Sequence, residues 1–418
     1  MKKLYVYANF DWLREEELIG TLAYESLRGS DSYAFEYDKG WLARHGDVFL
    51  SDDLNNYPGM QYTQLDKDIF GCFSDALPDR WGRTLLNRRE QITAEEEKRP
   101  VRRLSSFDYL MGIDDYSRMG GFRFKERIDG EYINVAVPLR IPPLTDLREL
   151  IAASEEIEIS EEKNLLPEKK WLQQLIQPSS SLGGARPKAS VIDACHTLYV
   201  AKFPSRKDDY DMGLWEHFSH LLAKKAGINA ASTKVIPTGN KYHTLLSQRF
   251  DRTTNGNRIH FASAMTLLGL SDGDNAHTGH GYLDIVDFIL QHCTDVEANL
   301  QELYRRVAFN ICIGNTDDHF RNHGFLLCEK GWTLSPAYDM NPTLNTAQSL
   351  LINETTNESN LQALRTSCEA YMLPQAVADK IIEEIVLAIK DWQSLATRLG
   401  ISQREQAYFA DRFEASLE

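Results

Sequence analysis

The stretch from Phe309 to Leu327 places the strongest constraint on the fold of this 418-residue chain. An apolar run gives way to a polar loop, and an apolar, strand-like segment follows. The loop carries Asp317, His319 and Asn322, so an Asn lies five residues after an Asp. In phosphoryl-transfer sites such an Asp accepts the hydroxyl proton and such an Asn holds a Mg²⁺ ion. The pair alone can occur by chance, but the pattern predicts a helix, a catalytic loop and a strand.

A tight hairpin is predicted directly after this loop. The segments Gly324 to Leu327 and Trp332 to Leu334 flank Cys328 to Gly331, whose Gly can take the left-handed turn position. The second strand runs into Asp339, so the hairpin returns a further carboxylate toward the loop. A hairpin also separates the catalytic loop of kinases from their metal-binding Asp. The alternative, a solvated loop and a helix-capping Asp, does not account for this order.

Composition excludes several classes of protein. A net charge of -15 argues against a chain that binds nucleic acid directly, without a partner, through a basic surface. The six cysteines are scattered without a CxxC spacing, which indicates reduced thiols and not a disulfide framework or a zinc site. The start of the sequence lacks the apolar region of a signal peptide, and no run is long enough to span a membrane. We therefore expect a cytoplasmic protein.

The periodicity of apolar residues divides the chain into four regions. Residues 1–145 indicate mixed strands and short helices, and residues 146–176 indicate helices with an acidic, solvated face. Strand-like segments and one helix follow, and beyond about residue 260 nearly all is helical. Expected strands are Lys3–Ala8, Tyr33–Tyr37, Val48–Ser51, Thr197–Pro204, Lys234–Ile236 and Tyr242–Phe250; expected helices are Phe70–Asn87, with a new start at Pro78, and Asp211–Gly227.

A glycine-containing loop spans residues 179–188, just before a strand. Gly183 and Gly184 would let backbone N–H groups approach phosphate oxygens, and Arg186 and Lys188 could add positive charge. The loop matches neither of the two common phosphate-binding glycine motifs. Taken alone, it is better interpreted as a surface turn.

Lys202 lies within an apolar strand, where an unpaired ammonium group would be costly. It could contact ATP phosphates and pair with Glu216 of the next helix, or it could be a snorkelling edge-strand Lys. Residues 248–250 could form an inter-lobe hinge whose backbone binds adenine, or a plain core strand. The features from the glycine loop to Asp339 follow the order expected of a two-lobed kinase. Their shared order is more specific than any one of them.

The chain resembles the HipA family of serine/threonine-protein kinase toxins. The resemblance covers nearly the whole chain, is looser at Leu77–Arg83, and is carried elsewhere by the motifs Ser181–Lys188, Ala201–Pro204, Arg249–Arg252, Gly314–Asn322 and Tyr338–Asp339. It implies an α+β, two-lobed protein-kinase-like fold. The expected parts are an α/β amino-terminal subdomain (1–145), a kinase N-lobe (146–255) and an all-helical kinase C-lobe (256–418).

The resemblance also implies ATP and Mg²⁺ as cofactors and gives each motif a role. Asp317 is the implied catalytic base, with Lys202 and His319 as further catalytic residues, and Asn322 and Asp339 are the implied metal ligands. The implied nucleotide-binding residues are Gly183, Gly184, Ala185, Arg186, Pro187, Lys188, Lys202, Gln248, Arg249, Phe250, His319, Arg321, Asn322, Tyr338 and Asp339. Ser181 fits the family's autophosphorylation site, with Ser179 and Ser180 as adjacent alternatives.

The implied partners are a protein substrate and an antitoxin. Family members phosphorylate proteins, including aminoacyl-tRNA synthetases, and are held in check by a small helix-turn-helix antitoxin of the HipB type. We therefore expect this chain to reach DNA only through such an antitoxin, and to need no membrane.

Two alternatives stay open at this point. The sequence has no His-Arg-Asp before its catalytic Asp and no Asp-Phe-Gly after it, whereas Asp-x-His-x-x-Asn is shared with lipid kinases. A phosphoinositide-like lipid kinase is disfavoured because the chain has no basic, membrane-facing stretch. A catalytically silent regulator that only binds its antitoxin is the second alternative, against which the intact motif residues argue.

Overall fold

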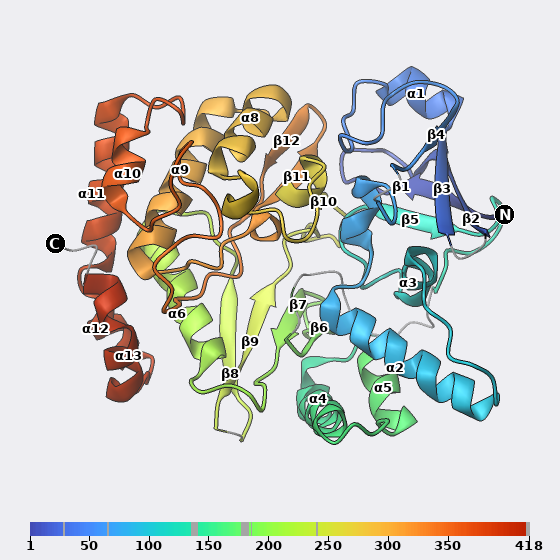
Figure 1. Cartoon of the computed structure of the whole chain (residues 1–418), viewed down its shortest axis with the longest axis horizontal. Coiled ribbons are helices and arrows are strands. Elements are labelled where there is room, and N and C mark those ends of the chain that lie inside the picture. Colours follow the sequence, from blue (N-terminus) through green and yellow to red (C-terminus); the bar gives the residue numbers. More distant parts are fainter. Residues whose placement is uncertain are drawn as a thin grey trace. The chain divides into compact units, whose positions relative to one another are not determined.

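The computed structural model describes residues 1–27, 30–64, 67–134, 141–176, 184, 186–239 and 241–414. The chain forms two compact units, and each contains helices and strands (Figure 1). The first unit is Met1–Lys207 with Gln248–Ala262, and the second is Asp208–Ser247 with Ser263–Glu418. The three-part division expected from the sequence stays a prediction.

The first unit is built on a five-stranded antiparallel sheet in the order β4-β3-β2-β1-β5. Leu4, Val6 and Ala8 alternate along β1 toward the buried side. The strands are β1 (Lys2–Ala8), β2 (Glu17–Leu27), β3 (Ser30–Tyr37), β4 (Met60–Tyr62) and β5 (Phe122–Lys125). The expected strands at β1 and β3 are confirmed, but Val48–Ser51 is not a strand.

Helices and one hairpin complete the first unit. Asp79 caps α2 by accepting a hydrogen bond from the Gly82 N–H (2.8 Å), so the predicted helix start near Pro78 is confirmed. The helices are α1 (Lys39–His45), η1 (Gly71–Ala76), α2 (Arg80–Glu96), α3 (Ser106–Gly112), η2 (Leu144–Asp146), α4 (Leu147–Glu162) and α5 (Lys169–Ile176). Strands β6 (Lys188–Ile192) and β7 (Leu198–Lys202) pair antiparallel, with Lys188 opposite Lys202.

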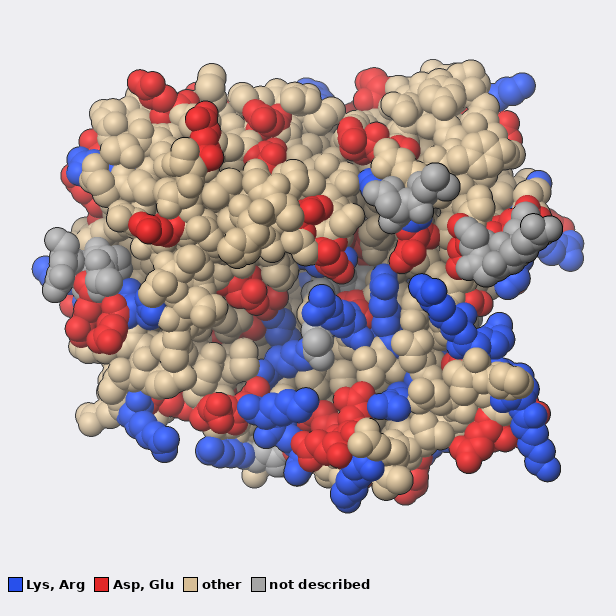
Figure 2. Space-filling view, viewed as in Figure 1, with Lys and Arg blue, Asp and Glu red and all other residues tan. Residues whose placement is uncertain are grey.

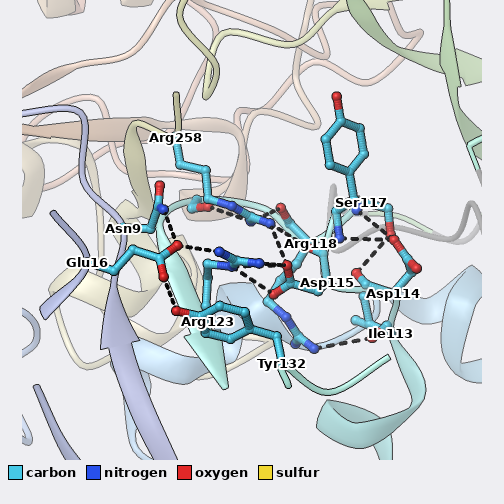
Figure 3. Close-up of polar contacts among 12 residues, drawn as sticks. Asn9, Glu16, Ile113, Asp114, Asp115, Ser117, Arg118, Arg123, Tyr132 and Arg258 are labelled. Atoms are coloured by element: carbon cyan, nitrogen blue, oxygen red, sulfur yellow. Dashed lines mark hydrogen bonds and ion pairs between the residues drawn. The ribbon is translucent and has the colours of Figure 1, made fainter. Parts of the chain in front are cut away.

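A buried ionic cluster ties the segment Gln248–Ala262 to the rest of the first unit (Figure 3). Asp115 Oδ2 lies 2.7 Å from the Arg123 guanidinium and 3.1 Å from that of Arg258. Burial alone would raise the pKa of Asp115, but Arg258 and Arg123 lower it. The carboxylate therefore stays ionised between two cations.

The sequence motif Arg249–Arg252 belongs to the same cluster. Arg249 and Asp251 are fully buried and lie 2.6 Å apart, and Arg249 also donates to the Ser117 carbonyl (2.6 Å). Burial alone would raise the pKa of Asp251, but Arg249 and Arg252 hold it far below its ordinary value. Removing one partner of such a pair leaves an uncompensated buried charge, which is costly.

The second unit is mainly helical. Its central helix α9 packs against α8, α10, α11 and α13. The helices are α6 (Met212–Lys225), α7 (Ala264–Leu267), η3 (Ala276–Thr278), α8 (Tyr282–His292), α9 (Val296–Ile313), η4 (Phe320–Asn322), α10 (Leu361–Thr366), α11 (Gln375–Ile389), α12 (Trp392–Arg398) and α13 (Gln403–Glu414). No helix among the described residues is long and apolar enough to cross a membrane.

Two antiparallel hairpins accompany these helices. The strands are β8 (Thr233–Pro237), β9 (His243–Gln248), β11 (Gly324–Cys328) and β12 (Gly331–Leu334), while β10 (His260–Ser263) begins in the first unit and ends in the second. The expected helix at Asp211–Gly227 and the expected strands at β7, β8 and β9 are confirmed, with ends that shift by a few residues. The β11–β12 hairpin predicted after the polar loop is also confirmed.

Candidate active site

Helix α9 ends where the polar loop begins. Gly314 closes the helix with φ +67°, a left-handed conformation that glycine adopts without strain. The Asn315 N–H then donates to the Asn310 carbonyl (2.9 Å), which satisfies a carbonyl of the last helical turn. The predicted change from apolar helix to loop is confirmed, and the loop leaves the buried core at a fixed angle.

Asp318 anchors this loop in the core. Its Oδ2 accepts hydrogen bonds from Tyr282 Oη (2.7 Å) and Asn310 Nδ2 (2.7 Å) and lies 2.8 Å from His323 Nε2. Burial alone would raise the pKa of Asp318, but His323 and the hydrogen bonds lower it. Asp318 was not among the predicted site residues, because nothing in an Asp-Asp pair tells which carboxylate is buried.

Asp317, in contrast, is exposed at the surface of the loop. Partial burial is the largest cause that raises the pKa of Asp317, and the nearby carboxylates of Asp339 and Asp318 raise it further. His319 lowers it, but does not cancel the rise. A raised pKa brings the carboxylate closer to the range of an effective general base. The repulsion also shows that the carboxylates of Asp317 and Asp339 share one electrostatic environment, which a cation would relieve.

Asn322 lies in η4 and is largely buried, at 9% exposure. Its Nδ2 donates to the Asp317 carbonyl (3.2 Å), so the side chain is oriented by the loop itself. Tyr338 Oη donates to the Arg321 carbonyl (2.5 Å), and Arg321 Nε donates to Asp272 (2.7 Å). The amide oxygen of Asn322 is the atom of this side chain that is suited to a metal ion.

The β11–β12 hairpin leads to Asp339 along a fixed path. Ala337 is held on both sides, because its N–H donates to the Asn229 carbonyl (2.7 Å) and its carbonyl accepts from the Ala231 N–H (2.9 Å). Asp339 has φ +57°, a conformation that non-glycine residues seldom adopt. Backbone strain of this kind gathers at functional sites, where the surrounding structure holds the residue in place.

The residues of this site fit ATP and Mg²⁺. His319 Nδ1 is buried and has no hydrogen-bond partner in the described part of the chain, so it is available to a ligand. Among the described residues no group of three His, Cys, Asp or Glu side chains could hold a metal ion. Asn322 and Asp339 would hold a Mg²⁺ ion through their side-chain oxygens, the ligand type that this ion prefers.

The described part of the glycine loop is held by residues of α2. Lys188 Nζ lies 3.0 Å from Asp79 Oδ2, and both side chains are 3% exposed. The Gly184 carbonyl accepts from the Trp81 N–H (3.4 Å). Ser181, Gly183 and Ala185 lie outside the described residues, as do Ser179 and Ser180. The predicted phosphate contact of Lys188 stays a prediction, and it would require this ion pair to be shared or broken.

Three further predicted nucleotide residues flank the β6–β7 hairpin. Arg186 Nε donates to the Phe203 carbonyl (3.0 Å), and the Phe203 N–H donates to the Pro187 carbonyl (2.9 Å). Lys202 is the last residue of β7. These contacts fix the exit of the glycine loop beside the end of β7, the strand that carries Lys202.

The predicted hinge, residues 248–250, begins at the last residue of β9. Gln248 is exposed and Phe250 is half-buried, with its ring 5.9 Å from that of Phe261. The Arg249 N–H donates to the Leu198 carbonyl (2.9 Å), and its side chain belongs to the ionic cluster. In this structure Arg249 therefore supports the hinge through its side chain and its N–H group.

Glu216, the partner expected for Lys202, is buried in α6 at 4% exposure. Its Oε2 accepts a hydrogen bond from Asn341 Nδ2 (3.4 Å), two residues beyond Asp339. Lys202 and Glu216 belong to different units, and their pairing stays a prediction.

Helix α2 carries charged side chains of both signs. Figure 2 shows basic and acidic side chains over the region of α2 on the face drawn; the basic residues of α2 itself are all Arg. This helix alone carries Arg80, Arg83, Arg88 and Arg89. The same helix carries Glu90, Glu95 and Glu96, so its arginines are accompanied by negative charge.

A mainly helical unit that carries an Asp-x-His-x-x-Asn loop, a hairpin and a following Asp defines a protein-kinase-like fold. Residues 12–107 match the HipA N-terminal domain and residues 180–393 match the HipA-like C-terminal domain. The chain belongs to the HipA family, as the sequence motifs predicted.

Solved and curated relatives agree with this assignment. HipA of Shewanella oneidensis MR-1, solved with HipB and operator DNA, has a similar fold, with a TM-score of 0.68 and 18% identity over 99% of this chain and 96% of that one. The confirmed fold class is therefore α+β and kinase-like.

Two curated relatives are similar over part of the sequence. A serine/threonine-protein kinase toxin HipA of Shewanella oneidensis is 26% identical over 225 residues, 47% of this chain and 50% of that protein. A putative kinase of Haemophilus influenzae is 25% identical over 181 residues, 39% of this chain and 52% of that protein. The chain thus spans about half the length of the curated relatives that it matches.

Proposed function

We propose that this protein is an ATP- and Mg²⁺-dependent serine/threonine protein kinase and the toxin of a toxin-antitoxin module. The observation that carries the proposal is the local architecture: α9 ends at a loop with Asp317 and Asn322, and the β11–β12 hairpin then leads to Asp339, which helps to raise the pKa of Asp317. The amide of Asn322 is oriented by the Asp317 carbonyl in the same site. Membership of the HipA family supports the same chemistry.

Each residue has a part in the proposed mechanism. Asp317 orients the acceptor hydroxyl and takes its proton. Asn322 and Asp339 would hold Mg²⁺, which when bound would supply positive charge near the phosphoryl group. His319, Arg321 and Tyr338 shape the nucleotide site, together with the residues of the glycine loop. Lys202 contacts the phosphates, and residues 248–250 receive the adenine.

The proposed substrate is a component of translation such as an aminoacyl-tRNA synthetase, by analogy with the family. A HipB-like helix-turn-helix protein is the proposed antitoxin, because the Shewanella relative was solved together with HipB and operator DNA. A cytoplasmic location is part of the proposal, since such a module acts on operator DNA there. Autophosphorylation at Ser181 would add about -1.5 to -2 charge next to the nucleotide phosphates and turn the enzyme off.

Exchange of the catalytic base tests the proposal. Asp317→Asn should lower phosphoryl transfer by roughly two to four orders of magnitude, because the proton acceptor is lost, while ATP affinity stays within a factor of about two. Transfer of radiolabelled γ-phosphate to protein and mass spectrometry of Ser181 give the readout, with Asp287→Asn on the surface of α8 as the matched control. Near-normal transfer by a folded Asp317→Asn protein would reject the assignment of the base.

The pH dependence gives a second readout of the same residue. The base must be deprotonated to work, so the rate should rise with pH as Asp317 titrates. Because the pKa of Asp317 is raised, this limb should lie above the range of an ordinary Asp. A wild type that binds Mg²⁺-ATP but transfers no phosphate at any pH would instead indicate a silent regulator.

A further inference from the structure

A polar cavity lies beside the catalytic loop within the second unit. It has a volume of about 740 Å³ and is lined by Asp317, by residues 343–349 and by parts of the segments around Asn275 and Asn357. Its volume is in the range of ligand-binding pockets. Of its lining residues, Asp317 and His277 are titratable, and the others carry amide, hydroxyl or apolar side chains.

One wall of the cavity is attached directly to the catalytic loop. The Thr343 N–H donates to the Gly314 carbonyl (2.9 Å), and both the N–H and the Oγ of Ser349 donate to the Thr316 carbonyl (2.9 Å each). Thr316 Oγ1 and Thr343 Oγ1 lie 2.5 Å apart. Hydroxyl and backbone groups of the wall therefore attach it to the catalytic loop.

Gln348 presents an unused hydrogen-bonding group in this wall. The residue is 1% exposed, and its Nε2 donates to Ser359 Oγ (3.1 Å). Its Oε1 is buried and has no hydrogen-bond partner within the part of the chain that the structure describes. A buried acceptor without a partner is costly, so this oxygen is suited to a donor supplied by a ligand.

The lining chemistry excludes one class of occupant and favours another. No Lys or Arg among the described residues lines the cavity, and Asp317 adds negative charge, so the polyanionic nucleotide is a poor match. A polypeptide main chain offers an N–H donor and a C=O acceptor at each residue, which amide and hydroxyl side chains can match without charge.

We propose that this cavity binds the acceptor polypeptide, as an extended segment with uncharged neighbours around the Ser or Thr that receives the phosphate. Gln348 Oε1 accepts a main-chain N–H of that segment, and exposed Asn345 provides a second amide contact. The acceptor hydroxyl then lies next to the carboxylate of Asp317. Its oxygen forms the new bond to the γ-phosphorus, its proton passes to Asp317, and the bond to the departing ADP breaks. This proposal rests on the proposed kinase function and adds its substrate class.

A pair of variants separates the ligand contact from the local packing. Gln348→Met and Ser359→Ala both remove the hydrogen bond between these two side chains, but only the first also removes the free Oε1. Asn345→Ala, at an exposed position, is a further variant that should fold normally. The substrates are two synthetic peptide pools with Ser or Thr acceptors, one with uncharged and one with charged flanking residues.

The wild type should phosphorylate the uncharged pool faster than the charged one. Gln348→Met should raise the peptide KM about tenfold, and Asn345→Ala several-fold, while the KM for ATP stays within about twofold and Ser359→Ala changes neither. An equal effect of Ser359→Ala, a preference for charged flanks, or no peptide phosphorylation by an enzyme that modifies itself would overturn this inference alone. A wild type without any phosphoryl transfer would overturn the proposed function as well.

Discussion

Two adjacent aspartates show how residue-level chemistry divides within the site. Asp318 is buried, its pKa is lowered by His323 and hydrogen bonds against the effect of burial, and it anchors the loop. Asp317 lies at the surface of the loop and is only partly shielded from water; this partial burial and the nearby Asp339 raise its pKa. The ionised Asp318 contributes its full stability to the loop above the pKa of an Asp in the unfolded chain. This contribution is lost as the pH falls through the lowered pKa of Asp318 in the folded protein.

The metal ligands give a prediction at the same scale. Asn322→Ala and Asp339→Asn should each weaken Mg²⁺-dependent ATP binding about tenfold or more, because each removes an oxygen ligand of the ion. Asn also tolerates the left-handed backbone at residue 339, so the exchange leaves the local fold intact. Thermal shifts with Mg²⁺-ATP and with ATP and a chelator measure the effect, with Asp411→Asn as the control. Equal Mg²⁺-ATP stabilisation of variant and wild type would show that the metal site lies elsewhere.

At the scale of elements, α2 and β6 are joined by the buried pair of Asp79 and Lys188. Asp79→Asn keeps a good helix cap but leaves a buried ammonium group, and should destabilise the fold by about 3–5 kcal/mol. The double variant with Lys188→Met should lose much less than the sum of the two single variants. Chemical denaturation gives these free energies, with the exposed pair Lys169 and Glu96 as a control that should change by less than about 1 kcal/mol. Additive effects at Asp79 and Lys188 would contradict the coupling.

The whole molecule carries a net charge of -15, which disfavours direct binding to the negatively charged DNA backbone. The isolated chain should bind duplex DNA only feebly at physiological salt, whereas its complex with a basic helix-turn-helix partner should bind tightly. A titration of operator DNA at several salt concentrations, with and without the partner, measures both states. Tight binding by this chain alone would contradict the expectation.

The sequence alone determined the order of the chemical features. The apolar helix, Gly314, the loop from Asp317 to Asn322, the hairpin and Asp339 follow one another closely, so periodicity and turn chemistry predicted them and the structure confirms the elements. It also determined the family, because several short motifs in a fixed order are more specific than any one motif. Strand β2 was missed, because Gly20 and the acidic residues at its start do not follow a clear alternation.

Only the tertiary structure decided which polar groups are buried and what they contact. It separated Asp318 from Asp317, paired Lys188 with Asp79, and placed Arg249 in an ionic cluster. It also revealed the cavity beside Asp317 and the unused oxygen of Gln348. The physical reason is that backbone conformation follows from neighbours along the chain, whereas burial and pairing depend on residues that only folding brings together.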